Sequence, residues 1–373
     1  MKKIVSLVVF IICIVACSSS DDGATPDTGN GSGGETAFNR AEMLTNLADN
    51  IIIPSYQALN TDLGALETAK DNFITTPNQA NLDALRGAWL TAYKAWQHVE
   101  AFNIGLAEQT GYYFQMNTYP VNVTDVENNV TNGNYDLGST NNNDAVGFPA
   151  LDYLLYGLAD SDPNIIAKYD TDTNAAKYTT YLSDLITQMQ TLTQDVLSDW
   201  TNTYRNTFVA STANTATSAT NKFINDFIFY YEKGLRANKI GIPAGNFSAT
   251  PLPDRVEGYY NQQVSKELAL EALDAVIAIF NGTEFGGSNA GESFKTYLIS
   301  LDRADLATLI SNQFNTARGK IQELDANFAT QINSDNTKMT QAYDALQAAV
   351  VLLKVDMLQA FDISVDFVDA DGD

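Results

Sequence analysis

Apolar residues at helical spacing are the feature that most limits what this chain can fold into. They recur every three or four positions over long stretches, as on the buried face of an amphipathic helix. Strand-like alternation of apolar and polar residues is scarce. The predicted helices cover residues 38–63, 79–105, 174–204, 217–238, 255–281, 303–331 and 335–361. We therefore expect an all-α fold built from helices that are long enough for antiparallel bundles.

Two segments interrupt this helical pattern. Pro54 falls inside the first predicted helix, and it should kink or divide that helix because proline lacks an amide donor. Residues 106–146 are rich in Asn, Gly and Tyr, and they predict a long irregular connection.

The start of the chain has the pattern of a lipoprotein signal. Two lysines precede an apolar run over residues 4–16, which is too short for a permanent spanning helix. Cys17 follows the small residue Ala16. We expect residues 1–16 to be removed as a signal peptide and Cys17 to carry lipid chains that hold the protein on a membrane. Cys13 would leave with the signal, so the mature protein would keep no thiol for a disulfide or a thiolate metal site.

Residues 17–36 consist mainly of Ser, Asp, Gly and Thr, and they predict a flexible tether behind the lipid. The expected location is the cell envelope, on the periplasmic or the surface face of the outer membrane. The formal net charge of the chain is −24, and it becomes about −26 once Lys2 and Lys3 are removed. So acidic a protein is repelled by nucleic acid and by anionic membrane surfaces.

Residues 147–157 form a short apolar segment with one charge. Pro149 suits the first turn of a helix, and Gly157 suits a left-handed stop. Asp152 is the only charged residue of the segment. In such apolar surroundings its carboxylate must find a donor, a cation or a proton.

A second carboxylate lies at the end of an aromatic stripe. Trp89, Tyr93, Trp96 and Glu100 follow one another at spacings of four, three and four, so they share a helix face. Burial would raise the pKa of Glu100 unless a cation or several donors lie near. One interpretation is a bundle-rim glutamate bonded to tyrosine or backbone amides, and the other is a functional carboxylate.

Basic residues near the end of the predicted helix 217–238 allow two interpretations. Arg236 and Lys239 either cap the helix C-terminus, where cations are favoured, or reach Glu100 or Asp152. Asp254 and Glu257 have the spacing of a capping arrangement at the start of the next helix, and we interpret Glu257 as structural.

The sequence lacks the residues that several kinds of site require. His98 is the only histidine, so a histidine-rich zinc or iron centre cannot form within one chain. We expect His98 to lie at the surface or at the rim of a bundle. Residues 369–373 resemble the start of a calcium loop, but the chain ends before the final glutamate. The sequence contains no Gly-rich phosphate loop, nucleophile elbow or His-Glu-x-x-His motif, and we assign no catalytic residue.

Several blocks resemble the imelysin-like family of bacterial envelope proteins. The Gly-x-His-x-x-Glu motif of that family is broken here: Gly147 matches, Pro149 stands in the His position and Asp152 stands in the Glu position. A proline ring nitrogen cannot bind a metal. Further blocks with this resemblance are Trp96-x-x-x-Glu100-x-Phe102-x-x-Gly105, Asn117 to Pro120, Lys239 to Gly245 and Val256 to Tyr260.

The resemblance implies two packed helical bundles, each built around four helices, with the functional site in the cleft between them. We place the bundles at residues 37–205 and 206–373. The implied function is a membrane-anchored binding component linked to uptake of iron or another ligand, with Glu100, Asp152, Arg236 and Lys239 lining the cleft. Two carboxylates without histidine suit iron or another oxygen-ligated cation, and they also suit a ligand with hydroxyl or cationic groups.

Two alternatives remain open at this point. One is a metallopeptidase, as the family name implies, although the loss of the motif histidine at Pro149 argues against it. The other is an interaction module that no longer binds metal, in which Asp152 pairs with a basic residue. The expected partners are the membrane, through lipid on Cys17, and an envelope uptake system that handles the cargo.

Overall fold

Helices make up nearly all of the regular structure. The computed structural model describes residues 38–367, and within this range it contains helices and one isolated bridge between Thr283 and Ala290, with no strand. The prediction of an all-α fold is confirmed. The predicted signal peptide (1–16), Cys17 with its tether (17–36) and the acidic residues 369–373 lie outside the described residues.

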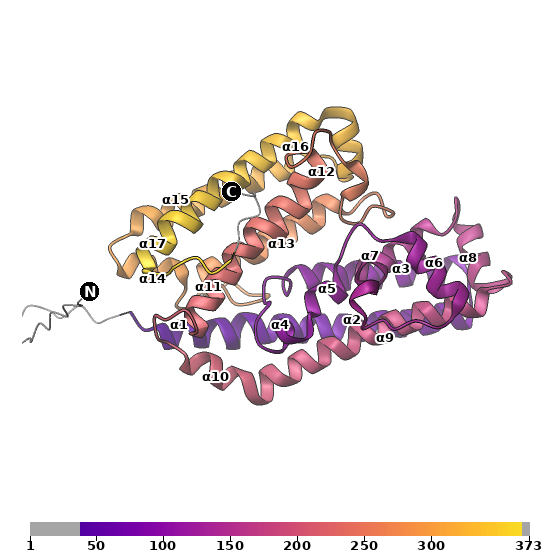
Figure 1. Ribbon diagram of the computed structural model, residues 1–373, viewed down its shortest axis with the longest axis horizontal. Helices are drawn as coiled ribbons and strands as arrows, with labels where there is room; N and C mark the ends of the chain where they lie inside the picture. The colour runs from indigo at the N-terminus through magenta and orange to yellow at the C-terminus, as the bar shows by residue number, and fades with distance from the viewer. Residues whose placement is uncertain (1–37, 368–373) are drawn as a thin grey trace, which may run out of the picture. The chain divides into compact units, whose positions relative to one another are not determined.

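The helices of the first half are numbered along the chain, and Figure 1 labels the α-helices among them. The symbol η marks π-helical or 3-10 segments. They are α1 (Arg40–Asn46), η1 (Leu47–Ile52), α2 (Ile53–Thr75), α3 (Gln79–Gln97), α4 (Leu106–Thr110), α5 (Tyr112–Met116), α6 (Val123–Asn132), η2 (Thr140–Ala145), α7 (Gly147–Asp152), η3 (Tyr153–Gly157), α8 (Asp162–Asp170), α9 (Ala175–Asp199), η4 (Trp200–Tyr204) and α10 (Arg205–Ala210). Helix α2 packs along both α3 and α9, and α8 lies against α9.

The second half forms another group of packed helices. They are α11 (Ala219–Phe229), η5 (Tyr230–Gly241), α12 (Ile242–Ala244), η6 (Pro253–Arg255), α13 (Ser265–Asn281), α14 (Phe294–Ser300), α15 (Ala304–Gln322), α16 (Phe328–Val351), η7 (Leu352–Met357) and α17 (Leu358–Phe361). Helix α15 packs against both α13 and α16 (Figure 1). Both α13 and α16 also pack against η5. The bundle boundary near residue 205 stays a prediction.

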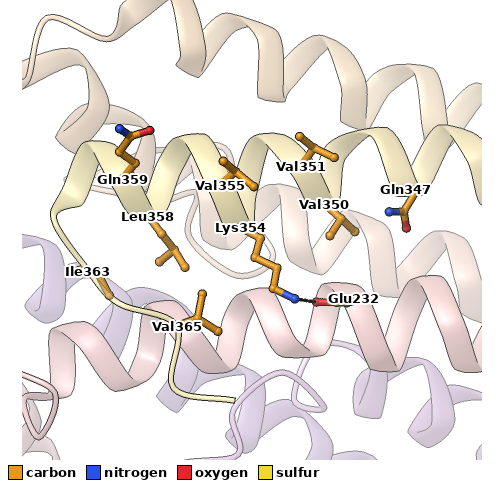
Figure 2. Close-up of a pocket in the computed structure, with 10 residues that line it drawn as sticks. All are labelled: Glu232, Gln347, Val350, Val351, Lys354, Val355, Leu358, Gln359, Ile363 and Val365. Carbon is orange, nitrogen blue, oxygen red and sulfur yellow. Dashed lines mark hydrogen bonds and ion pairs between the residues drawn. The ribbon is translucent and has the colours of Figure 1, made fainter. Parts of the chain in front are cut away.

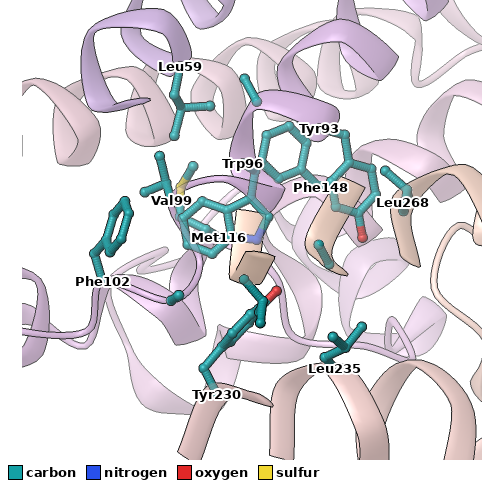
Figure 3. Packing of buried hydrophobic residues seen from close by; sticks show 14 of the residues in the cluster. Leu59, Tyr93, Trp96, Val99, Phe102, Met116, Phe148, Tyr230, Leu235 and Leu268 are labelled. Atoms are coloured by element: carbon teal, nitrogen blue, oxygen red, sulfur yellow. The ribbon is translucent and has the colours of Figure 1, made fainter. Parts of the chain in front are cut away.

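Apolar side chains from both halves share one core. Figure 3 shows Tyr93, Trp96 and Phe148 from the first half close to Tyr230 and Leu268 from the second. All of these side chains are buried, and the Tyr93 and Phe148 rings stack with centroids 4.5 Å apart. The hydrophobic cluster is therefore continuous between the halves, so burial of apolar surface stabilises their contact.

Polar pairs at the rim of the core join α3 to α13. Lys94 Nζ lies 2.6 Å from a Glu267 oxygen and 3.0 Å from a Glu271 oxygen. His98 Nε2 lies 3.1 Å from Glu271. Hydrogen bonding to His98 and then to Lys94 lowers the pKa of Glu271 to about 2, although partial burial opposes this shift. His98 is thus a half-buried rim residue with a carboxylate partner.

Several predicted helix boundaries are wrong, and near two of them the chain turns at a glycine with positive φ. The helix predicted over 79–105 ends at Gln97, and the chain then turns through Gly105 at φ +63°. The helix predicted from residue 255 begins only at Ser265, after Gly258 at φ +68°. The segment 106–146, expected to be irregular, contains α4, α5, α6 and η2.

Pro54 does not divide its helix. The backbone angles stay helical from α1 through η1 into α2, and Pro54 lies in the first turn of α2. The π-helical turn before it shifts the hydrogen-bond pattern, so the missing proline donor is accommodated. Between residues 38 and 367, none of the helices combines the length and the hydrophobicity that crossing a bilayer requires.

Candidate functional site

A buried cluster of three charged side chains lies where the two halves meet. Lys239 Nζ lies 2.8 Å from Glu257 Oε2 and 3.1 Å from Glu100 Oε2. The exposed fractions are 1% for Lys239, 2% for Glu257 and 4% for Glu100. One ammonium group thus pairs with two carboxylates away from water, and it occupies the position between them where a cation would sit. We call these three residues the Lys239 cluster.

Each member of the Lys239 cluster comes from a different part of the chain. Lys239 lies near the end of the π-helical segment η5, and Glu100 lies in the turn after α3. Glu257 lies in the turns between η6 and α13. Insertions of π-helix are frequent at functional sites because they change which side chains face inward. The cluster therefore forms only when the chain is fully folded.

Neutral polar side chains complete the hydrogen bonding of the two carboxylates. Asn117 Nδ2 donates to Glu100 Oε1 (2.7 Å) and to Glu257 Oε1 (2.9 Å). The Tyr230 hydroxyl donates to Glu100 Oε2 at 3.0 Å, and Gln97 Nε2 donates to Glu257 Oε1 at 3.2 Å. Hydrogen bonds of this kind hold the two buried carboxylates in one geometry.

The electrostatics of the Lys239 cluster favour charged lysine. Burial alone would lower the pKa of Lys239, but Glu100 and Glu257 outweigh burial and raise that pKa. Burial, and secondarily the same carboxylates, raise the pKa of the Tyr119 and Tyr230 hydroxyls well above the usual range. Both phenols therefore stay neutral, and the Tyr230 hydroxyl acts as a hydrogen-bond donor to Glu100.

Asp152 has separate partners. Its oxygens accept the backbone N–H groups of Tyr260 (2.8 Å) and Asn261 (2.9 Å). It is 2% exposed, and it lines a pocket of about 200 Å³ together with Pro149 and Tyr119. Among residues 38–367, no hydrogen bond or ion pair joins Asp152 to the Lys239 cluster or to a basic residue. The donors that this lone carboxylate requires are thus backbone amides.

The glycines of the same segment have different roles from one another. Gly147 adopts φ +72°, and a Cβ atom there would lie 2.2 Å from the Met116 carbonyl oxygen. The expectation that Gly157 forms a left-handed stop is wrong, because it is not among the glycines with positive φ. It is instead the point of close approach for Tyr260, whose ring would lie 2.4 Å from a Cβ atom at residue 157.

The buried carboxyl group of Asp152 should make the free energy of unfolding depend on pH. Burial raises the pKa of Asp152 to about 7, although the amides of Tyr260 and Asn261 oppose this. The folded protein then binds more protons than the unfolded chain between about pH 4 and 7, so the free energy of unfolding falls as the pH rises through this range. We expect Asp152→Asn to flatten this fall in urea unfolding series. An equally steep fall in the variant would contradict this assignment.

Arg236 lies in a different cluster from Lys239. It is fully buried, donates to the Tyr343 hydroxyl (2.6 Å) and contacts Gln347 and Glu232. Glu232 also pairs with Lys354 at 3.2 Å, at the edge of a groove of about 530 Å³ (Figure 2). The expectation that Arg236 reaches Glu100 or Asp152 is therefore not met, because its guanidinium group is used between η5 and α16.

Glu100 opens into a second pocket. The pocket has a volume of about 320 Å³. Phe114, Phe229, Tyr113 and Tyr230 provide aromatic walls, from α5 on one side and the α11–η5 helix on the other. We call this the Glu100 pocket. A volume near 300 Å³ is at the small end of the range for ligand sites, and apolar walls with a few polar groups are typical of them.

Glu257, Asn117 and Tyr230 are the members of this site that sequence reasoning missed. The spacing of Glu257 predicts a helix cap, but α13 begins eight residues later and the carboxylate points to Lys239. A signal was present, because Glu257 and Asn117 both fall in blocks that resemble a known family. Helical periodicity could not find them, since both lie outside helices.

Fold and site together define an all-α imelysin-like protein. The model of the imelysin family, which is also named peptidase M75, matches residues 52–356, well over half of the chain. The chain therefore belongs to the imelysin family.

Relatives with known names are distant in sequence. The iron-regulated protein A of Synechococcus elongatus is 22% identical over 303 residues, which cover 80% of each chain. A crystal structure of an imelysin-like protein from Psychrobacter arcticum 273-4 aligns with a TM-score of 0.71 at 18% identity, covering 88% of this chain and 97% of that one. A candidate iron-regulated protein A precursor from Parabacteroides distasonis aligns with a TM-score of 0.69 at 16% identity, covering 87% and 95%.

The donor groups do not fit the resident metal that a metallopeptidase needs. Such a metal requires about three protein ligands and an open position for water. Among residues 38–367, no three His, Cys, Asp or Glu side chains come together in a way that could hold a metal ion. Pro149 offers no ligand atom, and the Lys239 ammonium group fills the space between Glu100 and Glu257. We derive no hydrolytic step for this chain.

Proposed function

We propose that this protein is a membrane-anchored binding component of an envelope system linked to iron supply, and that it holds an organic ligand in the Glu100 pocket. The link to iron is supported by the names of the iron-regulated relatives in Synechococcus and Parabacteroides. Anchoring in the cell envelope is supported by the signal pattern that ends at Cys17.

The observation that carries this proposal is the Glu100 pocket itself. Its walls come from both halves of the chain, and a carboxylate held by Lys239, Asn117 and Tyr230 forms part of its lining. In such a pocket, a fixed polar group orients the ligand and the aromatic walls contribute affinity by burying its apolar surface. The pocket therefore supports binding, whereas the Lys239 cluster argues against a bare metal ion as the cargo at these carboxylates.

Asp152 and Pro149 have a structural part in this proposal. The Asp152 carboxylate holds the loop at Tyr260 and Asn261 through two backbone amides. That loop follows Glu257 directly, so Asp152 supports the position of one member of the Lys239 cluster. The broken motif thus contributes to the shape of the site and not to the ligand contacts.

A pocket-filling variant tests the proposal. Asn103 is half-buried and lines the Glu100 pocket, so Asn103→Trp should fill it from the rim. We expect Asn103→Trp to fail to restore the iron content of cells that lack this protein and are grown in iron-limited medium. The exposed control Asn132→Trp should restore it fully at the same level of folded protein.

The comparison has two outcomes that would overturn the proposal. One is full restoration by Asn103→Trp, which would mean that the pocket is not used. The other is an unchanged cellular iron content when the protein is deleted, which would remove the link to iron.

A further inference from the structure

A second carboxyl group lines the Glu100 pocket, and it has no hydrogen-bond or ion-pair partner in the part of the chain that the structure describes. Asp226 lies on α11, one turn before Tyr230, and its side chain is half-buried. Between residues 38 and 367, its carboxyl group makes no hydrogen bond and no ion pair. Glu100, by contrast, is fully engaged with Lys239, Asn117 and Tyr230. Asp226 is therefore the acidic group of the pocket that is left for a ligand.

The charges around Asp226 make its surroundings negative. Burial first, and then the charges of Glu108 and Asp366, raise the pKa of Asp226 to about 7, and Lys222 opposes them. Lys233 also lines the pocket, but it is not among the charges that shift the pKa of Asp226. Asp226 is therefore affected by two carboxylates, Glu108 and Asp366, and by one ammonium group, Lys222. Because negative charge is in excess, a positive charge beside Asp226 would be stabilised.

Two aromatic rings stand beside this carboxyl group at the pocket walls. Phe114 on α5 is 55% exposed and Phe229 on α11 is 41% exposed, both high values for such large apolar side chains. Both line the Glu100 pocket. Aromatic faces attract cations and also cover apolar groups, and each cation–π contact contributes on the order of 0.5–2 kcal/mol.

We propose that the Glu100 pocket binds a small organic cation, whose ammonium group pairs with Asp226 and whose apolar body lies against Phe114 and Phe229. This inference rests on the proposed function, because it names the chemical class of the ligand for the same pocket. The unpartnered carboxyl group, the excess of negative charge around it and the aromatic walls all favour this class. An anion would be repelled by the Asp226 carboxylate, and a neutral ligand would leave that carboxylate unpaired at the pH where it is ionised.

Three probes of similar size but different charge test the inference. We would titrate the protein at pH 8 with phenethylamine, 2-phenylethanol and 3-phenylpropionate by isothermal calorimetry. We expect phenethylamine to bind at least about tenfold more tightly than the other two, because only it supplies a cation. Asp226→Asn should weaken phenethylamine about tenfold, and the exposed control Asp195→Asn should leave its affinity unchanged.

Proton release provides a second readout that does not depend on affinity alone. Near pH 6, Asp226 must lose its proton to pair with an ammonium group, so binding should release protons in the wild type and not in Asp226→Asn. Calorimetry in two buffers of different ionisation enthalpy measures this difference.

The outcomes separate this inference from the proposed function. Equal binding of all three probes, lost in Asn103→Trp, would overturn the cation assignment and leave the pocket as a binding site. Binding that is unchanged in Asn103→Trp would place the probes elsewhere and count against both. Failure of phenethylamine to bind the wild type would also overturn the inference.

Discussion

Replacing Lys239 with methionine is expected to lower the free energy of unfolding by about 3–5 kcal/mol, the largest loss that we predict for a single charge in this protein. The physical reason is that Glu100 and Glu257 would remain buried without their shared cation. Methionine keeps most of the volume of the lysine stem, so the loss of packing is small. Urea unfolding followed by circular dichroism at pH 7.5 measures the difference.

Two controls separate loss of the buried charge from loss of a charge in general. Lys94→Met removes a half-exposed lysine that pairs with Glu267 and Glu271, and it should cost at most about 1 kcal/mol. The double variant Lys239→Met/Glu257→Gln should regain part of the loss, because one unpaired carboxylate is gone. Equal losses in Lys239→Met and Lys94→Met would contradict this account.

Gly147→Ala is expected to be the most damaging small substitution in the segment 147–157. A side chain at φ +72° costs about 1–2 kcal/mol by itself. The new Cβ atom would also lie 2.2 Å from the Met116 carbonyl oxygen, which is backbone and cannot swing aside. We expect a total loss of about 2–5 kcal/mol in the free energy of unfolding, since forced shifts in a packed core add about 1–3 kcal/mol.

Gly133→Ala is the matched control for this prediction. Gly133 has φ +65°, close to that of Gly147, but no atom lies within 4 Å of the position that a Cβ atom would take there. Gly133→Ala should therefore lower the free energy of unfolding only by the cost of the left-handed backbone, about 1–2 kcal/mol. If both variants showed the same loss in the free energy of unfolding, the close contact with the Met116 carbonyl would not be the reason why residue 147 must be glycine.

The helical fold could be predicted because its signal is local. Apolar spacing along α3, α9 and α13 is strong enough to predict helices without knowledge of their neighbours. Helix ends were less predictable: α3 ends at Gln97 and α13 begins at Ser265, whereas apolar spacing continued the helical pattern to residues 105 and 255. The π-helical segment η5 gave no signal distinct from an α-helix, yet it carries Lys239.

The site could be predicted only in part, because its contacts join residues far apart in the chain. The sequence singled out Glu100, Asp152 and Lys239, and the structure brings Glu100 and Lys239 together but leaves Asp152 on backbone amides. The sequence could not show which of Arg236 and Lys239 reaches Glu100, because both lie near the end of the same helix. Only the structure shows that Arg236 bonds to Tyr343 on α16 instead. A lone buried carboxylate predicts that donors exist, but it does not predict which ones.

The most direct test of the central claim is calorimetric titration of chelator-treated protein with Zn²⁺, Fe²⁺ and ferric citrate, beside Glu100→Gln and Glu257→Gln. Our account predicts weak binding at many acidic surface groups, the same in all three proteins, because Lys239 already fills the space between the two carboxylates. One tight ion per chain, lost in both variants, would contradict it and would show that a metal displaces Lys239 from the cluster.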